Sequence, residues 1–598
     1  MDGFIYRESR YIPGESLLYS ELVDLYEKIQ GTTKRLEMTK YLVDLFKRMP
    51  GEVIDKVVYL TEGRLYPDFV DVETGMAEKM ALKALAMACG LPPERVEQEL
   101  RHKGDIGTAA ESLLKEKKQG TLSKKELPVE EVYASLDRIA RTKGAGSVDM
   151  KVRALSGLLL EAKPVEAKYI LRTITGKMRL GIADMTILDA LAQAFADKSA
   201  RKIVERAYNL TSDLGDIART LSTEGIGAVR KYHARVGRPV RMMLAQRMES
   251  AGEILEKIRR PVCEWKYDGE RIQIHKQGDE ITLFSRRLEN ITAQYPDIAA
   301  LARLNMKVKE AIIEGECVAV DADTGAMLPF QDLMHRRRKY GIEKAVREFP
   351  VHIFLFDALL IEGEDITQEP LAERRERLRN AIKEAAGFRL VQSLLSDNVK
   401  EIEAFFESAI ENGCEGLILK SGDSTYQAGA RSWLWIKLKR SYQSKMIEPI
   451  DVVIVGALMG RGRRSGSYGA LLVSVYDSER DVFPTITKVG SGFTDEDLKN
   501  MPEILAPYRL EHRHARVESG LEADLWFTPA VVIEIIGDEL TLSPVHMCAY
   551  NRIRENAGIA VRFPRFTHRW RVDKAPEDAT TVDEIIEMYR ARLRKIEL

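Results

Sequence analysis

Paired cysteines are missing from this sequence of 598 residues. The cysteines are scattered singly with no C-x-x-C pair between them: Cys89, Cys263, Cys317, Cys414 and Cys548. This pattern argues against a disulfide framework and against a zinc finger, and it favours a reducing compartment. The histidines offer one loose pair, His512 and His514, which is more typical of a protein surface than of a metal site.

Long apolar runs are also absent. No stretch of about 18 apolar residues occurs, so no segment is predicted to span a membrane. The N-terminal sequence MDGFIYRESRYIPGE has no basic segment followed by an apolar one, and we therefore expect no secretory signal. A Walker A sequence is missing, which disfavours a P-loop ATPase or helicase. These absences together predict a cytoplasmic protein.

Neither sign of charge dominates the composition. Lysine and arginine number 91 and aspartate and glutamate 92, so the formal net charge is −1. Binding to nucleic acid would therefore require basic faces within a neutral protein. The length predicts roughly three or four domains rather than one core.

Apolar spacing divides the chain into three regions. Up to about residue 235, apolar residues recur at helical intervals, as in Leu22, Leu25, Tyr26 and Ile29. The next region holds short β-rich runs such as RIQIHK and EGLILK with helical stretches between them, which predicts an α+β domain on antiparallel sheets. β-rich runs around Gly-rich turns then predict a small barrel. The predicted domains are 1–235, 236–446 and 447–598.

Lys266 lies in the sequence CEWKYDGERIQIHK, between two aromatic residues and shortly before Asp-Gly. Asp-Gly predicts a tight turn, and the alternation of Ile272 and Ile274 with polar residues predicts a strand after it. Lys266 would then be fixed at the end of a strand, close to Arg271. A neighbouring cation lowers the pKa of a lysine and leaves more neutral amine to act as a nucleophile. Taken alone, a lysine beside a hairpin turn explains the short motif at least as well.

Charged residues recur beside β-type runs downstream of Lys266, in the order FSRRLENIT, IIEGECVAVD, FLFDALL, CEGLILK, WIKLKR and RWRVDK. Glu316 and Glu415 interrupt apolar strands, where a carboxylate is costly unless it is paired or bound to a metal. Lys437 and Lys439 alternate with apolar residues, so both ammonium groups would share one face of a strand. A lysine nucleophile with carboxylates and several cations predicts phosphoryl or nucleotidyl transfer assisted by Mg²⁺.

In these motifs and in their order, the chain resembles the ATP-dependent DNA ligases of the archaeal and eukaryotic replicative type, within the covalent nucleotidyltransferase superfamily. The resemblance covers nearly the whole chain. It implies a multidomain α+β protein with an all-α N-terminal DNA-binding domain, an α+β nucleotidyltransferase (adenylation) domain and a C-terminal OB-fold β-barrel.

The same resemblance implies an enzyme that seals 5′-phosphate/3′-hydroxyl nicks in duplex DNA, in replication, repair and recombination. The implied route passes through a lysyl-AMP enzyme and an AMP-DNA intermediate. The implied cofactors are ATP and Mg²⁺, with Mn²⁺ as a substitute, and the implied partner is nicked double-stranded DNA. A monomer is expected. A sliding clamp is a candidate partner, although no clamp-binding peptide is evident.

Residue roles follow from the resemblance as well. Lys266 would be the nucleophile, Glu264 would read the adenine amino group, and Phe356 would stack on the base. Arg571 and Lys574, in the R-x-D-K motif, would orient the leaving pyrophosphate. The full set of implied nucleotide contacts is Glu264, Arg271, Arg286, Glu316, Phe356, Arg431, Lys437, Lys439, Arg571 and Lys574. The implied metal ligands are Glu316 and Glu415.

Two basic segments are candidate DNA contacts. EAKYILRTITGKMRLGIA resembles part of the family's helical DNA-binding domain, and MGRGRRSGSYGALL places arginines on a Gly-rich turn. Phosphate contacts give affinity without sequence preference, which nick sealing requires. A solvated basic loop explains both segments equally well, and the run HRRRKY (335–340) is interpreted as a solvated face. The candidate contacts are Lys177, Arg179, Arg461, Arg463 and Arg464.

Other functions stay open at this point. An RNA capping guanylyltransferase shares the lysine motif, the barrel and R-x-D-K, but the long helical region with TGKMRLG argues against it. An RNA ligase shares the core, usually without these flanking domains. An NAD-dependent ligase should carry a four-cysteine zinc site, which single cysteines do not supply. A catalytically dead DNA-clamping scaffold would have no need of Lys266, Glu415 and Lys437 together.

Overall fold

The structure is a computed structural model that describes residues 17–72, 76–116, 126–248, 250–321, 325, 327–328, 330–338, 341–439, 449–460 and 467–594. The chain forms two units. The first contains Met1–Arg247, Ile254–Ile402 and Ile418–Lys437, and the second contains Met248–Glu253, Glu403–Leu417 and Leu438–Leu598. Among the described residues, no helix combines the length and the apolar character needed to cross a bilayer.

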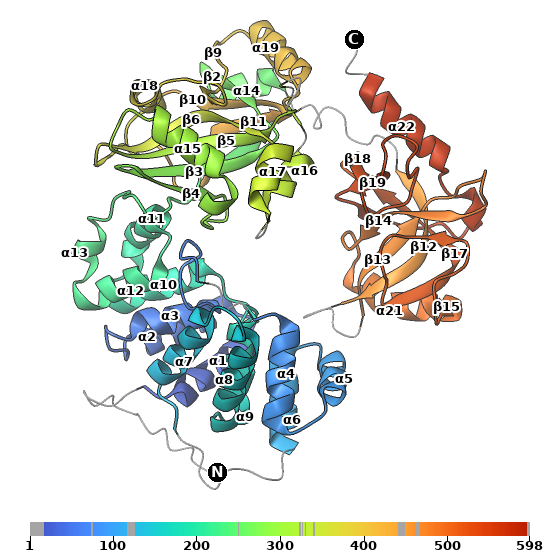
Figure 1. Ribbon diagram of the computed structural model, residues 1–598, viewed down its shortest axis with the longest axis horizontal. Coiled ribbons are helices and arrows are strands. Elements are labelled where there is room, and N and C mark those ends of the chain that lie inside the picture. The colour runs from blue at the N-terminus through green and yellow to red at the C-terminus, as the bar shows by residue number, and fades with distance from the viewer. Residues whose placement is uncertain are drawn as a thin grey trace. The chain divides into compact units, whose positions relative to one another are not determined.

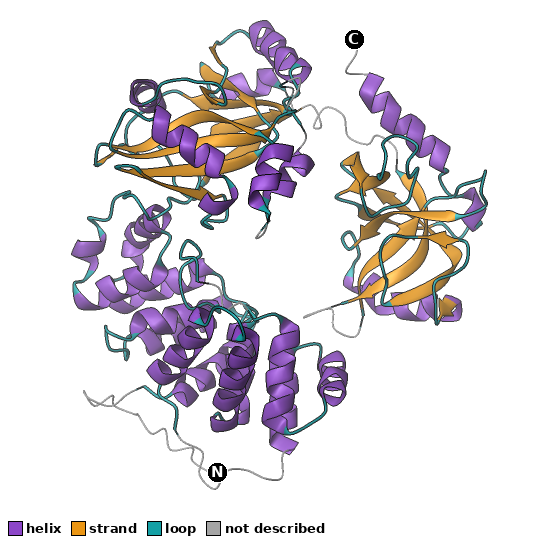
Figure 2. Cartoon of the chain, in the orientation of Figure 1, coloured by secondary structure: helices purple, strands orange, loops and turns teal. Residues whose placement is uncertain are grey.

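The N-terminal region is helical, as the apolar spacing predicts (Figures 1 and 2). Its helices are α1 (Tyr19–Gln30), α2 (Arg35–Phe46), α3 (Ile54–Glu62), α4 (Glu78–Cys89), α5 (Pro93–Lys103), α6 (Ile106–Glu116), α7 (Val129–Arg141), α8 (Ser147–Glu161), α9 (Pro164–Ile174), α10 (Asp184–Phe195), η1 (Lys198–Ala200), α11 (Arg201–Thr211), α12 (Leu214–Thr223) and α13 (Ile226–Val229).

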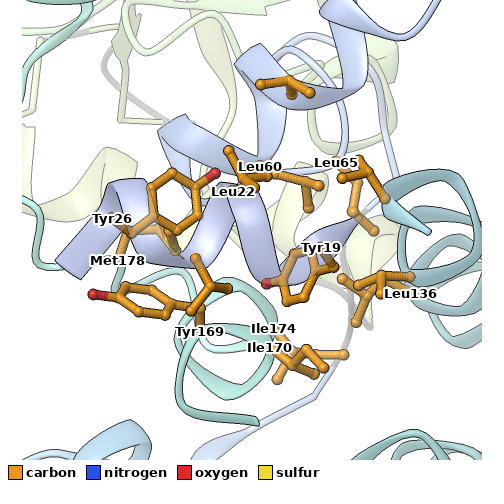
Figure 3. Packing of buried hydrophobic residues seen from close by; sticks show 14 of the residues in the cluster. Tyr19, Leu22, Tyr26, Leu60, Leu65, Leu136, Tyr169, Ile170, Ile174 and Met178 are labelled. Carbon is orange, nitrogen blue, oxygen red and sulfur yellow. The ribbon is translucent and has the colours of Figure 1, made fainter. Parts of the chain in front are cut away.

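One apolar core holds this helical region together (Figure 3). Tyr26 of α1 and Tyr169 of α9 meet in it with ring centroids 5.1 Å apart. Met178, which follows α9 in the basic segment TGKMRLG, is buried in the same core. Burial of a side chain of this size contributes about 1.5–3 kcal/mol. The basic segment is therefore anchored from within by its own methionine.

The middle region combines strands with covering helices. Its elements are β1 (Leu244–Arg247), α14 (Ala251–Lys257), β2 (Pro261–Lys266), β3 (Glu270–Gln277), β4 (Glu280–Ser285), η2 (Thr292–Gln294), α15 (Pro296–Asn305), β5 (Glu310–Ala319), α16 (Phe330–Leu333), η3 (Met334–Arg336), α17 (Ile342–Glu348), β6 (Val351–Ile361), β7 (Glu364–Asp365), α18 (Leu371–Ala381), β8 (Phe388–Leu390), β9 (Ser393–Leu395), α19 (Val399–Glu411), β10 (Gly416–Ser421) and β11 (Arg431–Lys439).

These strands form two sheets. One runs β4-β3-β5-β6-β7 with β8 beside β6, and the other runs β1-β11-β10-β2-β9. β3 pairs antiparallel with both β4 and β5, and β5 pairs antiparallel with β6. The chain passes from the second sheet to the first at residues 267–269, because β2 ends at Lys266 and β3 begins at Glu270. The predicted strand end and turn at Lys266 are therefore present.

The C-terminal region is rich in strands. Its elements are β12 (Ile450–Met459), β13 (Tyr468–Ser474), β14 (Phe483–Val489), α21 (Asp495–Leu505), η5 (Ala506–Tyr508), β15 (Arg509–Leu510), β16 (Val517–Glu518), β17 (Leu525–Ile536), β18 (Glu539–Ser543), β19 (Gly558–Arg562), β20 (Arg565–Trp570), η6 (Pro576–Asp578) and α22 (Val582–Arg594). The main sheet runs β15-β17-β12-β13-β14-β16 with β20 beside β17, and β18 pairs with β19. The fold class predicted from the sequence is confirmed.

The interpretation of the basic run HRRRKY as a solvated face is wrong for Arg336. No part of the Arg336 side chain is exposed, and its guanidinium bonds to the carboxylate of Asp297 at 2.6 and 3.0 Å. It also donates to the backbone carbonyls of Gln294 and Phe349. A guanidinium has enough donors to satisfy all of these acceptors at once. The last two residues of the run lie outside the described part of the chain.

Replacing Arg336 should test this correction. Arg336→Ala leaves Asp297 and two carbonyls without their donor, and we expect the free energy of unfolding to fall by roughly 2–3 kcal/mol. Arg338→Ala is the matched control, since Arg338 is exposed in the same run, and its effect should stay within about 0.5 kcal/mol. Urea denaturation followed by tryptophan fluorescence measures both. Equal midpoints for the two variants would contradict a structural role for Arg336.

Candidate active site

Lys266 is held half-buried at the end of β2 by the residue that follows it. The ring of Tyr267 stacks on Phe354 of β6, with centroids 4.0 Å apart and planes 8° from parallel. Successive side chains of a strand point to opposite faces, so Lys266 shares its face with Glu264. The strand end that carries Lys266 is thus fixed on the neighbouring sheet.

The turn after Tyr267 leaves no room for a side chain at position 269. A Cβ atom on Gly269 would lie 2.2 Å from the carbonyl oxygen of Cys317 in β5, so only glycine fits there. The carboxylate of Asp268 accepts the backbone N–H of Phe330, at 3.1 Å, and so joins the turn to α16. Both members of the Asp-Gly pair therefore have structural reasons to be there.

Glu264 is buried and paired with two cations. Its carboxylate contacts the ammonium of Lys420 in β10 at 2.6 Å and accepts a hydrogen bond from Arg375 in α18. The Lys420 ammonium also lies 4.4 Å from the ring centroid of Phe356 and 4.1 Å from that of Trp435. Burial lowers the pKa of Lys420, and the carboxylates of Asp357 and Glu314 act in the opposite direction.

Arg271 and Glu314 form a second buried pair, from β3 and β5. The guanidinium donates to the Glu314 carboxylate at 2.7 Å and to the carbonyl of Met243 at 2.7 Å. Tyr426 donates its hydroxyl proton to the same Glu314 oxygen, at 2.9 Å. Burial alone would lower the pKa of Arg271, but Glu314 raises it above the ordinary value. The guanidinium lies 5.1 Å from the Phe356 ring, so the two buried pairs flank one aromatic side chain.

Glu316 is half-buried and faces the same group of residues. It stands opposite Arg271 across β3–β5 and opposite Phe354 across β5–β6. Its charge helps to raise the pKa of Arg271. We refer to Glu264, Lys266, Arg271, Glu314, Glu316, Phe356 and Lys420 together as the Lys266 site. The site brings the Lys266 amine, three carboxylates and two further cations onto adjoining strands.

Three further residues with a predicted nucleotide contact belong to the first unit. Arg286, exposed after β4, lines a hollow of about 930 Å³ together with Arg64 and Arg241. Arg431 is exposed at the start of β11 and donates to the carbonyl of Ala245 at 3.3 Å. Lys437 is half-buried near the end of β11. Their predicted contacts with a nucleotide stay predictions.

In the second unit, two residues of the R-x-D-K motif share an anchor. Arg571 bonds to both carboxylate oxygens of Asp451 in β12, at 3.0 and 2.8 Å, and the ammonium of Lys574 lies 2.7 Å from the same carboxylate. Arg571 also donates to Asp573, and this bond lowers the pKa of Asp573 to about 2. The R-x-D-K motif therefore has a defined conformation held by Asp451. In the same unit, Glu415, just before β10, pairs with Lys439 at 2.6 Å.

Three family models match the chain in sequence. They are the ATP-dependent DNA ligase domain over residues 242–439, the DNA ligase N terminus over residues 18–192, and the ATP-dependent DNA ligase C-terminal region over residues 464–574. DNA ligase 2 of Thermofilum pendens is 54% identical over 96% of this chain and 98% of its own length. The DNA ligase of Staphylothermus marinus is 50% identical over 97% and 99%. The chain belongs to the ATP-dependent DNA ligase family.

Membership of this family makes the chain a covalent nucleotidyltransferase that seals nicks in DNA at the expense of ATP. Among solved structures, the protein titled Pmar-Lig_PreS3 has a TM-score of 0.52 over 92% of this chain and 99% of its own length, with 16% sequence identity. At that identity the likeness concerns the fold alone.

The candidate DNA contacts of this ligase have partners in the helical region. Lys177 is exposed and pairs with Glu78 at 3.1 Å. Arg179 has a left-handed backbone (φ 57°) and donates to the carbonyl of Gly104, while its guanidinium lies 3.4 Å from Asp105. Lys177 thus remains the more accessible cation of the two. Three further candidates lie outside the described residues: Arg461, Arg463 and Arg464.

Sequence reasoning missed Glu314, Lys420 and the buried pair Arg374–Asp357. Glu314 interrupts the same apolar strand as Glu316, so the signal used for Glu316 could have found it. Lys420 closes the run EGLILK, where an apolar strand ends in a cation. The Arg374–Asp357 pair has no exposed side-chain surface and supports β6 from α18. Its partners are far apart in sequence, and no local pattern joins them.

Lys420 should matter for nucleotide binding because it holds Glu264 and lies against Phe356. Lys420→Met removes a buried charged contact, which typically costs 1.5–3 kcal/mol, and we expect the ATP concentration for half-maximal self-adenylylation to rise at least about tenfold. Lys276→Met, which removes a buried lysine bonded to the Met306 carbonyl instead, should leave it within about twofold. Unchanged ATP dependence in Lys420→Met would show that the pair does not shape this site.

Proposed function

We propose that the Lys266 site carries out the nucleotidyl transfer of this ligase, with Lys266 as the nucleophile. The neutral Nζ of Lys266 attacks the α-phosphorus of ATP, a P–N bond forms, and the bond to pyrophosphate breaks. The AMP then passes to the 5′-phosphate of the nick, which restores the lysine. The 3′-hydroxyl finally attacks that phosphate and AMP leaves. The observation that carries the proposal is the place of Lys266 at the end of β2, directly before Tyr267 that stacks on Phe354, in a site with two buried charge pairs.

The surrounding residues divide the remaining work. Phe356 offers a ring face for the adenine, and Glu264 reads its amino group. Lys437 and Lys439 neutralise charge that develops on the α-phosphate, and Arg271, Arg286 and Arg431 contact the adenylate. Fixed cations of this kind stabilise a transition state without having to reorganise.

Glu316 and Glu415 would hold Mg²⁺, or Mn²⁺ in its place. Both supply carboxylate oxygens, the donor type that these hard cations prefer. Within the described residues, no group of three or more His, Cys, Asp or Glu side chains is close enough to hold a metal alone. Mg²⁺ typically takes one or two carboxylates plus substrate phosphates, so a full set of protein ligands is not required. When bound, the ion neutralises phosphate charge.

The domains have separate tasks in this proposal. Residues 1–235 bind duplex DNA through contacts that include Lys177 and Arg179, residues 236–446 carry out adenylation, and residues 447–598 form the OB-fold domain. The chain acts as a monomer in the cytoplasm during replication, repair and recombination, with a sliding clamp as a candidate partner. Arg571 and Lys574 orient the pyrophosphate while it leaves Lys266, and they have no such task once AMP is attached.

Covalent labelling tests the nucleophile. With Mg²⁺ and α-labelled ATP, the protein should keep label through denaturation as an acid-labile, base-stable phosphoramidate. Lys266→Ala should lose all label, since it removes the proposed nucleophile, whereas Lys276→Ala should retain it. Scintillation counting after gel electrophoresis gives the answer. Label that persists in Lys266→Ala, or label from GTP but not from ATP, would overturn the assignment.

A separate prediction concerns Asp451, which anchors the R-x-D-K motif. Arg571→Ala and Asp451→Ala should each slow self-adenylylation by about 100-fold, because the leaving group loses an oriented cation. Both should leave the sealing of a nick supplied already adenylylated within about threefold. Arg569→Ala, on the same segment but paired with Glu534, serves as the control and should affect neither step. Equal losses in the two steps would contradict the proposed role of the motif.

A further inference from the structure

A short connecting segment covers the polar face of β3. We call residues 234–243 the strap; it follows the helical region and leads into β1. Most of it lies between the two family models that match residues 18–192 and 242–439. Its residues Ala234, Val240 and Met243 are fully or almost fully buried and share an apolar cluster with Ile312 of β5. The strap is therefore packed onto the sheet and is no loose linker.

The backbone of the strap bonds to the side chains of β3. The N–H of Gly237 donates to Nδ1 of His275 at 3.1 Å. The N–H of Val240 donates to Oε1 of Gln273 at 2.8 Å, and Nε2 of Gln273 donates back to the carbonyl of Val240 at 3.1 Å. Gln273 thus pairs with one strap residue through both edges of its amide. Side chains on the buried polar face of β3 thus satisfy backbone groups of the strap that no neighbouring strand in the described part of the chain pairs with.

These bonds continue without a break to Arg271. Because Nδ1 of His275 accepts a hydrogen bond from the N–H of Gly237, its Nε2 carries the ring proton and donates to Oε1 of Gln273 at 2.9 Å. Burial lowers the pKa of His275 to about 3, so the ring stays neutral and this tautomer holds. Nε2 of Gln273 also donates to Oε1 of Glu314 at 3.2 Å, while the other oxygen of Glu314 accepts from Arg271.

The other side of the strap is tied to the helical region. The backbone N–H of Arg241 donates to the carbonyl of Asn209 at 2.7 Å, and its guanidinium donates to Asp184 at 3.0 Å. The hydroxyl of Ser212 donates to the carbonyl of Pro239 at 2.7 Å. The strap is thus bonded on one side to the ends of α10 and α11 and on the other side to β3. The bonds to the helices and the bonds to β3 together set the position of the strap relative to Gln273.

We propose that Gln273 is a positioning residue that orients Arg271 through Glu314. Only an amide offers two acceptor and two donor sites, and Gln273 uses all of them: it accepts from Val240 and His275 and donates to Val240 and Glu314. A glutamate or an apolar residue at 273 would leave one oxygen of Glu314 without its donor. Glu314 could then turn, and the guanidinium that it holds would turn with it.

The hold on Arg271 comes from its other nitrogens. Among the described residues, nothing accepts a hydrogen bond from its Nε, although the atom is buried. An orphaned buried N–H is costly, so the orientation of the guanidinium depends on the bonds to Glu314 and Met243. This inference rests on the proposed function, in which Arg271 contacts the adenylate. Gln273 itself touches no substrate.

A double-mutant cycle tests the proposal in the full-length chain. Gln273→Met keeps the length of the side chain and removes its hydrogen bonds. It should slow self-adenylylation and the sealing of a pre-adenylylated nick in the same ratio as Arg271→Ala does, by at least about tenfold in the more sensitive step. Gln277→Met is the matched control, because Gln277 lies at the exposed end of the same face of β3, and it should change neither step.

The combination of variants separates positioning from damage to the fold. If Gln273 acts through Arg271, adding Gln273→Met to Arg271→Ala should slow either step less than about twofold further. Binding of nicked DNA should stay within about twofold, since no DNA contact is touched. Additive losses in the double variant, or a loss of DNA affinity that matches the loss of rate, would overturn the proposal.

A replacement variant and the unmodified chain complete the test. If Gln273→Met does not fold, Gln273→Glu takes its place, since it keeps the accepting Oε1 and replaces the two N–H donors with a second oxygen. The same cycle then applies with the same expected non-additivity. If the unmodified chain takes up no AMP, the proposed function fails. If the unmodified chain is labelled and the cycle is additive, only the role of Gln273 fails.

Discussion

The crossing of the chain from one sheet to the other at residues 267–269 is the constraint on which the active site depends. The crossing is tight, because the backbone at Gly269 approaches the carbonyl of Cys317 more closely than any side chain would allow. Tyr267 is stacked on Phe354 at the same point. Lys266 is the last residue before this crossing, so the geometry of the two sheets sets where its amine lies. In the proposed mechanism, this backbone packing positions the lysine as the nucleophile and reduces the entropy lost on reaching the transition state.

Charge pairing around that lysine follows from burial. Glu264 with Lys420, Arg271 with Glu314, and Arg374 with Asp357 are pairs whose charges are nearly or wholly removed from solvent. Removing one partner of such a pair typically costs about 3–5 kcal/mol, whereas the intact pair contributes little net stability. Their value lies in orientation, because they fix cations and carboxylates before a nucleotide arrives. Preorganised charge is the largest single contribution to many enzymatic rate enhancements.

The sequence predicts what is local in this molecule. The helical region, the strand end at Lys266, the turn at Asp268–Gly269 and the alternation along β3 all follow from spacing within a few residues. The partners of the buried charges do not. Arg271 and Glu314 are 43 positions apart, and only the register of β3 with β5 brings them together. The alternation predicts a polar face of β3 but not its cover, since the strap that covers this face belongs to another region. Arg336 was misread because its acceptors come from elements that surround it in space.

The most direct test of this account is a crystal structure of the chain after incubation with ATP and Mg²⁺. We predict continuous electron density from Nζ of Lys266 to the phosphorus of AMP, with the adenine against the ring of Phe356 and its amino group beside Glu264. The pairs Glu264–Lys420 and Arg271–Glu314 should stand as they do without nucleotide, because preorganisation requires no rearrangement. Density for AMP on another side chain, or a base remote from Phe356 and Glu264, would contradict the central claim that the Lys266 site is the adenylation centre.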